Sequence, residues 1–263
     1  MDSKFKFKKS LGQNFLIDEN IINKIVSSAC IDKDTLVIEI GPGEGAISRR
    51  MAPLAKYLLC YEIDTSLKDK LDNLVNDNNN VIVKYGDFLK ASVSDDIKDY
   101  DYKKKYVVAN LPYYITTAII NKVISDGIMA DKMLVMVQKE VADRFVAKPN
   151  SKNYNSLTVY LNYYYDICKL FDVSSNCFIP RPKVCSTVVE FVIKKDRPYV
   201  KNMEVFNRLV RDSFRYKRKT LRNNLVGYNM DKVMSVLSKY NLDLSVRAEQ
   251  IPLEIFVEIA NSL

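Results

Sequence analysis

Short apolar runs rich in branched residues alternate with amphipathic stretches along most of the chain. Such runs, when turn residues bound them, are typical of buried strands. They predict strands over Thr35–Ile40, Tyr57–Glu62, Val81–Tyr85, Tyr106–Asn110 and Met133–Gln138, with two more near Asp166–Asp172 and Thr187–Ile193. The amphipathic stretches predict helices over Ala46–Leu54, Ser66–Val75, Thr116–Ile124 and Glu140–Ala147. This alternation is typical of an α/β fold, with a parallel sheet and helices on both faces.

The character of the chain changes at Lys194–Asn202, a charged segment containing proline that we interpret as a linker. Beyond it the pattern is helical only, and it predicts helices over Glu204–Phe214, Arg218–Val226, Met230–Tyr240 and Leu253–Asn261. We therefore predict a large α/β domain, residues 1–195, and a small all-helical domain, residues 196–263.

Composition narrows the chemistry that the chain can perform. Of its 263 residues, 48% are hydrophobic and 27% charged, the make-up of an ordinary globular protein. The absence of histidine excludes imidazole acid–base catalysis and histidine metal sites. The five cysteines are an odd number without C-x-x-C spacing, so we expect no disulfide framework and no metal. A net charge of +8 favours a polyanionic partner.

The sequence carries no membrane signal. No run approaches the roughly 18 apolar residues of a membrane span, and the basic first ten residues lack the apolar stretch of a signal peptide. Unpaired cysteines also fit a reducing compartment. We therefore expect a cytoplasmic protein with no membrane partner.

The first predicted strand runs into a glycine-rich turn that is typical of nucleotide-binding folds. Gly41, Gly43 and Ala46 satisfy the pattern G-x-G-x-x-G/A, and the helix that follows offers free N–H groups. Glu62 ends the second predicted strand, where a carboxylate can hold ribose hydroxyls. These residues alone fit a nicotinamide cofactor, S-adenosylmethionine or a tight turn without a ligand.

Two residues after the third predicted strand favour the methyl donor. Asp87 can accept a hydrogen bond from an adenine amino group, and Phe88 can pack against the adenine ring. An ordinary turn followed by a core aromatic residue is the alternative interpretation.

The fourth predicted strand ends in Asn110-Leu111-Pro112-Tyr113, the most informative tetrapeptide in the chain. The lone pair of adenine N6 is delocalised into the ring, so this nitrogen is a poor nucleophile. Hydrogen bonds to the Asn110 side-chain carbonyl and to a backbone carbonyl beside Pro112 would favour a pyramidal nitrogen. Proline helps to hold the segment rigid, and Tyr113 can stack on a base removed from its helix. No general base is needed, which suits a chain without histidine.

Several motifs resemble the KsgA family of ribosomal RNA small-subunit adenine N6,N6-dimethyltransferases. Their sequences are G-Q-N-F-L at 12–16, E-I-G-P-G-E-G at 39–45, N-L-P-Y at 110–113, F-I-P-R-P-K-V at 178–184, R-K-T-L-R-N at 218–223 and R-A-E-Q at 247–250. The resemblance runs from Lys9 to Leu263 in the family's order. Two positions depart from it: Tyr114 stands where asparagine is frequent, and Cys185 where aspartate is common.

The resemblance implies a Rossmann-like class I methyltransferase sheet and two sets of site residues. The first set would bind S-adenosylmethionine: Gln13, Asn14, Leu16, Gly41, Gly43, Glu62, Asp87, Phe88 and Asn110. The second would form the target-base pocket and carry the catalysis: Asn110, Leu111, Pro112, Tyr113 and Phe178. The implied substrate is small-subunit ribosomal RNA within a ribosomal subunit precursor. There, two adjacent adenines in a hairpin near the 3′ end each receive two methyl groups, a step in ribosome biogenesis, and we expect the enzyme to act as a monomer.

The segment Arg211–Arg222 carries six cations and one acid, with Phe214, Tyr216 and Leu221 between them. We expect a helix whose apolar members pin it to the small domain, while its cations neutralise RNA phosphates. The predicted RNA-binding residues are Arg215, Lys217, Arg218, Lys219 and Arg222. A merely solvated charged face is the alternative.

Three other functions compete with this interpretation. A macrolide-resistance methyltransferase shares N-L-P-Y but modifies large-subunit RNA, and the C-terminal motifs argue against it. A non-catalytic RNA-binding or ribosome-assembly factor is disfavoured by the intact tetrapeptide and glycine turn. A nicotinamide oxidoreductase would need an acid–base residue for hydride transfer, and none is evident.

Overall fold

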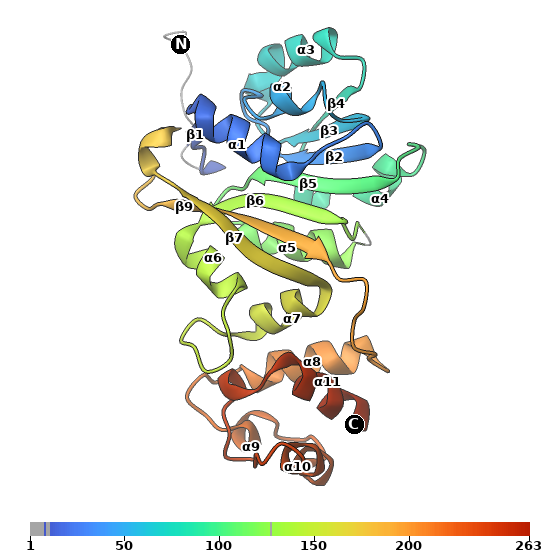
Figure 1. Ribbon diagram of the computed structural model, residues 1–263, viewed down its shortest axis with the longest axis vertical. Helices are drawn as coiled ribbons and strands as arrows, with labels where there is room; N and C mark the ends of the chain where they lie inside the picture. The colour runs from blue at the N-terminus through green and yellow to red at the C-terminus, as the bar shows by residue number, and fades with distance from the viewer. Residues whose placement is uncertain (1–7, 9–10, 127) are drawn as a thin grey trace. The chain divides into compact units, whose positions relative to one another are not determined.

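The computed structural model describes Lys8, residues 11–126 and residues 128–263, and it divides into two compact units (Figure 1). Unit 1 contains the described residues up to Ala142 together with Cys168–Ile193. Unit 2 contains Asp143–Ile167 and Lys194–Leu263. The linker predicted from the sequence therefore coincides with the return of the chain to unit 2. Residues 143–167, predicted from the sequence to belong to the first domain, cluster with unit 2 instead.

Unit 1 is built on a mixed sheet, and seven strands of it lie within the described residues, in the order β4-β3-β2-β5-β6-β9-β7. The strands are β2 (Thr35–Ile40), β3 (Tyr57–Glu62), β4 (Val81–Tyr85), β5 (Lys104–Asn110), β6 (Lys132–Gln138), β7 (Tyr165–Val173) and β9 (Ser186–Ile193). Those from β2 to β6 pair in parallel, and β9 pairs antiparallel to β6. The predicted α/β sheet is confirmed, and β2, β3 and β4 have the predicted bounds.

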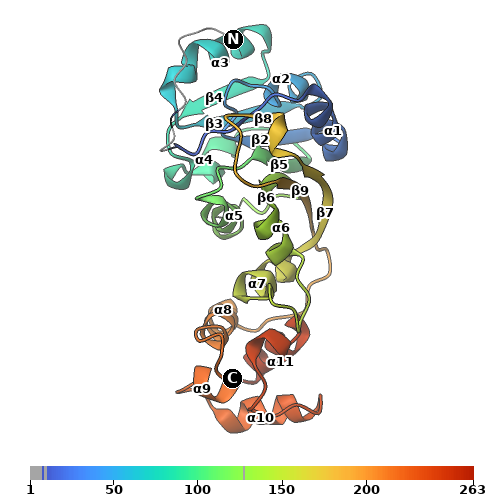
Figure 2. The same cartoon turned by 90° about the vertical axis from the view of Figure 1, so that its left-hand side faces the viewer.

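Helices cover both faces of this sheet. Their bounds are α1 (Glu19–Ala29), α2 (Ser48–Met51), α3 (Lys68–Asp77), α4 (Val93–Ile97), α5 (Thr116–Ser125) and α6 (Lys139–Phe145). Buried residues of α1, α2 and α3 pack into one core with Val37, Leu58 and Cys60 of the sheet. Figure 2 shows α1 and α5 on opposite sides of the sheet. The periodicity used above did not predict α1, although Asp18 caps it by accepting from Ile21 N at 3.1 Å.

A second, two-stranded sheet joins distant parts of unit 1. Strand β1 (Phe15–Leu16) pairs antiparallel with β8 (Phe178–Ile179), and Leu16 lies opposite Phe178. Both of these side chains are buried in the core. The pairing holds the N-terminal segment Leu11–Ile17, which we call the N-terminal strap, against the body of unit 1.

Helices are the only regular secondary structure of unit 2 over residues 196–263, the range predicted to form a helical domain. Unit 2 contains α7 (Ser156–Tyr164), α8 (Met203–Ser213), α9 (Leu221–Asn224), α10 (Met230–Ser238) and α11 (Leu253–Ser262). Its core includes Phe206, Leu209, Leu237 and Phe256, all fully buried. The sequence pattern did not predict α7, which begins at a capping box between Asn155 and Thr158. No helix among the described residues is long and apolar enough to cross a membrane.

The helix predicted over Arg218–Val226 is wrong in its first part, because only Leu221–Asn224 is helical. The preceding residues form an exposed turn that the buried side chain of Asn224 holds in place. Its Oδ1 accepts from Tyr216 N at 3.0 Å, and its Nδ2 donates to Ser213 O at 2.7 Å and to Tyr216 O at 3.2 Å. A side chain that satisfies backbone groups in this way competes with helix formation. We call residues Arg215–Lys219 the basic turn.

Replacing Asn224 should therefore destabilise unit 2. Asn224→Ala leaves three backbone groups of the turn without their partner, and a buried unpaired group costs ~1–3 kcal/mol. We expect denaturant unfolding to show a loss of that order. Asn223→Ala, at an exposed position of the same helix, should change stability by less than ~0.5 kcal/mol. Equal stability of the two variants would contradict the role assigned to Asn224.

Candidate active site

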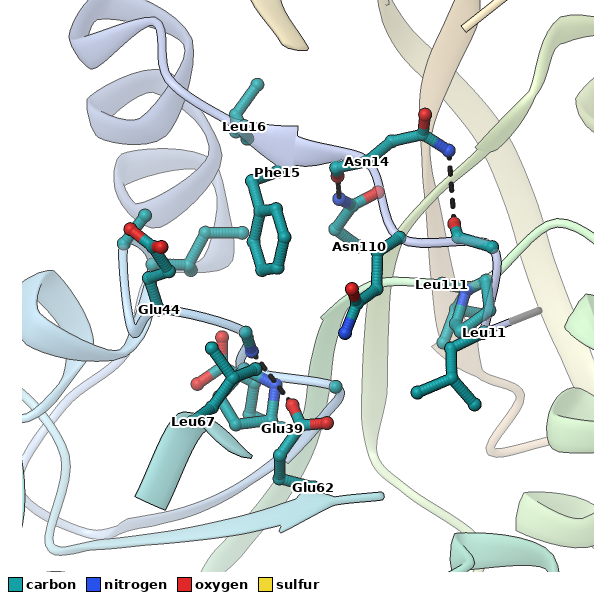
Figure 3. A pocket seen from close by; sticks show the side chains of 18 of the residues that line it. Leu11, Asn14, Phe15, Leu16, Glu39, Glu44, Glu62, Leu67, Asn110 and Leu111 are labelled. Atoms are coloured by element: carbon teal, nitrogen blue, oxygen red, sulfur yellow. Dashed lines mark hydrogen bonds between the residues drawn. The ribbon is translucent and has the colours of Figure 1, made fainter. Parts of the chain in front are cut away.

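A cavity of about 240 Å³ opens at the carboxyl ends of β2, β3 and β5 (Figure 3). The glycine turn after β2, Glu62 at the end of β3 and Asn110 at the end of β5 all line it. The N-terminal strap forms a further wall. In the strand order, the chain leaves β2 toward β3 on one side and reaches β5 on the other. Such switch points are where open α/β sheets bind ligands.

At two positions of the glycine turn, a residue other than glycine would introduce strain. Gly41 has φ of +71° and donates its N–H to Tyr61 O at 2.9 Å, which directs the chain back toward β3. Gly43 has φ of +59°, and a Cβ there would lie 2.7 Å from Cε1 of Phe15. The missing side chain thus lets the Phe15 ring of the strap pack on the turn.

Two buried carboxyl groups lie beneath this turn. Glu62 accepts from Gly43 N at 3.0 Å and from Asp64 N at 2.8 Å, and burial raises its pKa. Glu39 is 2% exposed, and burial raises its pKa to about 7. The thiol of Cys60 donates to Glu39 at 3.6 Å. Glu39 entered the sequence interpretation only as part of the glycine motif, although an acid inside an apolar strand was a visible signal.

The strap is anchored by Asp64, a residue that no sequence motif singled out. The buried carboxylate of Asp64 accepts from Gln13 Nε2 at 2.6 Å and from Lys8 Nζ at 2.5 Å. Burial acts to raise the pKa of Asp64, but hydrogen bonds from Lys8, Ser66 and Gln13 hold it at about 2. Because Asp64 N also binds Glu62, one residue links the strap to the end of β3.

The side-chain amide of Asn110 is oriented by the strap. Its Nδ2 donates to Asn14 O at 2.9 Å, as Figure 3 shows. The amino group of the amide is thereby engaged, whereas no donor among the described residues reaches Oδ1. Asn14 itself is held by a bond from its Nδ2 to Gly12 O at 3.1 Å. The arrangement leaves Asn110 with a free acceptor at the cavity.

The next three residues add a second acceptor and an aromatic ring. Pro112 O already accepts from Ile115 N at 3.2 Å and from Thr116 Oγ1 at 3.1 Å. Leu111 O, by contrast, has no donor in the described part of the chain. Tyr113 is half-buried, lines the cavity and shares a 2.6 Å hydrogen bond with Ser186 Oγ. Burial raises the pKa of its phenol, so the ring stays neutral.

Three predicted site residues do not line this cavity. Asp87 accepts from Leu89 N at 2.9 Å, and Phe88 is buried, with its ring centre 5.2 Å from that of Tyr61 in an edge-to-face arrangement. Both follow β4, one strand beyond Glu62. Phe178 is 2% exposed, because its pairing with Leu16 turns it into the core. The other predicted residues of unit 1 line the cavity: Gln13, Asn14, Leu16, Gly41, Gly43, Glu62, Asn110, Leu111, Pro112 and Tyr113.

The predicted RNA-binding cations form a separate group on unit 2. Arg215, Lys217, Arg218 and Lys219 lie on the basic turn, Arg222 lies on α9, and all five are exposed. The guanidinium of Arg215 lies 5.5 Å from the centre of the Tyr216 ring. Among the described residues, no cluster of three or more cysteines or carboxylates is placed to hold a metal ion.

Comparisons with known proteins cover nearly the whole chain. The family model described as ribosomal RNA adenine dimethylase matches residues 4–263. The ribosomal RNA small subunit methyltransferase A of Listeria welshimeri is 42% identical, with 98% of this chain and 91% of that protein covered. The protein of the same name from Geobacillus kaustophilus is also 42% identical, with 98% and 92% covered.

Two solved structures share the fold over almost their full length. A dimethyladenosine transferase from Plasmodium falciparum has a TM-score of 0.79 at 26% identity, with 93% of this chain and 95% of that chain covered. The 23S rRNA methyltransferase ErmE has a TM-score of 0.73 at 24% identity, with 95% and 99% covered. At that identity, the likeness to ErmE shows the fold alone.

The buried Glu39 should make stability depend on pH. Its pKa rises from 4.5 to about 7 on folding, so the folded state keeps a proton that the unfolded state has released. This contribution is full below pH 4.5 and is lost as the pH rises through about 7, by ~3 kcal/mol in total. We expect the free energy of unfolding to fall between about pH 5 and about pH 8, and Glu39→Gln to flatten that fall in denaturant titrations.

Asp64→Asn is the matched control, because the lowered pKa of Asp64 affects stability in another range. Its contribution is present above its ordinary pKa of 3.8 and is lost as the pH falls through about 2. The variant should therefore lose stability equally at all pH values in the tested window. A Glu39→Gln protein with the wild-type pH dependence would refute the account of Glu39.

Proposed function

Because the chain belongs to the ribosomal RNA adenine dimethylase family, we propose that its cavity is where adenine N6 of ribosomal RNA is methylated. The protein is an S-adenosylmethionine-dependent methyltransferase that dimethylates adenine in small-subunit ribosomal RNA. Our proposal extends this activity to two adjacent adenines in a hairpin near the 3′ end, within a subunit precursor. The observation that supports methylation in this cavity is a pair of acceptors, Asn110 Oδ1 and Leu111 O, that no donor among the described residues engages.

The residues around the cavity fit the cofactor of this reaction. S-adenosylmethionine supplies a methyl group made electrophilic by its sulfonium. The backbone of Gly41 and Gly43 can approach the methionine part closely, and the Glu62 carboxylate can accept from ribose hydroxyls. Gln13, Asn14 and Leu16 would bind from the strap, since all three line the same cavity.

That Asp87 and Phe88 bind the adenine part of the cofactor stays a prediction. Its support is the bond from Gly86 N to Glu62 O, 2.8 Å long, which holds their turn beside the end of β3. Phe178 stays a prediction for stacking on the target base, although its ring lies in the core.

The acceptors at the end of β5 would activate the target amine. Asn110 Oδ1 and Leu111 O can accept one hydrogen each from the adenine amino group. Two such bonds favour a pyramidal nitrogen and free its lone pair from the ring, so no general base has to act first. The half-buried ring of Tyr113 can stack on the extruded base and fix its plane. The reaction then depends on positioning alone, which suits a chain without histidine.

Two alternative functions have less support. The relatives with 42% identity are named for the small subunit, whereas the likeness to a large-subunit enzyme concerns the fold. A non-catalytic RNA-binding factor would have no need of an oriented Asn110 with a free acceptor. We also propose that the protein acts as a monomer in the cytoplasm, where its ribosomal RNA substrate is found.

Asn110→Ala should abolish methylation while leaving donor binding largely intact. The variant loses one of two acceptors for the amine, and losing one preorganised hydrogen bond to the reacting group costs ~100-fold or more in kcat. Transfer of labelled methyl groups to undermethylated small subunits measures turnover, and calorimetry measures donor affinity. Glu62→Ala provides the contrast, since it should weaken donor binding first. Retained turnover in Asn110→Ala would refute the role of Asn110.

Neutralising Lys217, Arg218 and Lys219 should flatten the salt dependence of RNA binding. These side chains are exposed on the basic turn, and each phosphate that the protein no longer neutralises reduces the slope of log K against log salt by ~0.7–0.9. We expect a decrease of about 2 in the magnitude of that slope. Neutralising Lys90, Lys98 and Lys103, exposed cations of unit 1, should change it less. Equal slopes in the two triple variants would mean that the basic turn is only a solvated face.

A further inference from the structure

Two consecutive tyrosines follow the acceptors at the end of β5, and their surroundings differ sharply. Tyr113 lines the cavity, and its hydroxyl is bound to Ser186. Tyr114 is 59% exposed, and no hydrogen-bond partner for its hydroxyl lies in the described part of the chain. Partial burial and a hydrogen bond therefore account for a tyrosine at position 113. A mostly exposed ring without a hydrogen bond among the described residues at position 114 needs another explanation.

The ring of Tyr114 is nevertheless held in a defined place. A Cβ on Gly12 would lie 3.1 Å from Tyr114 Cδ1 and 3.2 Å from Cε1, so the ring rests against the backbone of the strap. Gly12 has φ of +60°, a conformation that favours glycine and keeps this contact free of a side chain. Gly12 and Leu11 line the cavity, so the ring of Tyr114 lies at its rim.

We propose that Tyr114 stacks on the nucleotide next to the target adenine, as a residue that positions the RNA at the same site. The proposal rests on the proposed function, because it presumes that an adenine enters the cavity. When a base leaves its stack, the neighbouring base loses a stacking partner. An exposed aromatic ring fixed at the rim can replace that partner, and such stacking tolerates any base. Tyr113 then contacts the target base and Tyr114 its neighbour.

Kinetics on undermethylated small subunits test the proposal. Loss of one base–aromatic stack costs ~1–3 kcal/mol, so Tyr114→Ala should raise KM for the RNA by roughly 5- to 150-fold. We expect kcat and the affinity for S-adenosylmethionine to change little, because the ring does not reach the acceptors. Tyr114→Phe should restore the wild-type KM, since stacking needs the ring and not the hydroxyl. Tyr199→Ala is the control, an exposed tyrosine (76%) outside the cavity lining.

A spectroscopic measurement separates stacking from a merely structural effect on the strap. An RNA hairpin carrying 2-aminopurine beside the target adenine should keep its low fluorescence on binding the wild-type protein or Tyr114→Phe, because the ring replaces the lost stacking partner. Tyr114→Ala at saturating concentration should raise that fluorescence. An unchanged KM for Tyr114→Ala would overturn the proposal, as would low fluorescence with that variant bound.

The outcomes also separate this proposal from the proposed function. If Tyr114→Phe is as defective as Tyr114→Ala, the hydroxyl binds the RNA and stacking is refuted, while methylation itself stands. If the wild-type protein methylates but Tyr114→Ala has wild-type kinetics, only the role of Tyr114 fails. A wild-type protein that binds undermethylated small subunits without methylating any adenine would overturn both.

Discussion

The parallel pairing of β2 with β3 on one side and β5 on the other is the constraint on which the site depends. All six residues of β2 are buried, so the strand can occupy only the centre of the sheet. The register places Ile40 beside Tyr61, and Ile38 beside Val107. The three strands therefore end at one edge, where the glycine turn, Glu62 and Asn110 meet. A slip of one residue would reverse which side chains face the helices.

The N-terminal strap adds a further wall to the cavity at this edge. Asp64 binds Gln13 of the strap, and Asn110 binds the backbone of Asn14. Asp64 N also donates to Glu62, so the hydrogen bonds connect the end of β3 to the end of β5 through the strap. The amide of Asn110 is thus oriented by a backbone carbonyl 96 positions away in the sequence. Orientation of this kind is what a reaction without a general base requires.

Four of the five predicted RNA-binding cations of unit 2 lie on the basic turn, and the fifth, Arg222, lies on α9. Asn224 satisfies the backbone of the basic turn from a buried position, and the side chains of Arg215, Lys217, Arg218 and Lys219 are exposed. Lys217 Nζ also donates to Lys152 O at 3.1 Å. Exposed cations position a protein on RNA through phosphates and carry no sequence information. Under the proposed function, selection of the adenine therefore falls to unit 1, where Asn110 and Tyr113 line the cavity.

The sequence by itself determined the strands of the sheet, the glycine turn and the tetrapeptide after β5. These features are local and can be recognised without knowing the fold. They are runs of branched residues, glycines that permit a positive φ, and a proline that restricts its neighbours. Only the tertiary structure decided which side chains are buried and which hydrogen-bonding groups already have a partner. In the structure, Asp64 binds the strap and Phe178 is buried in the core. Asn224 stabilises a turn where the sequence predicted a helix. Each of these depends on contacts between residues that lie apart in the sequence, and periodicity carries no information about such contacts.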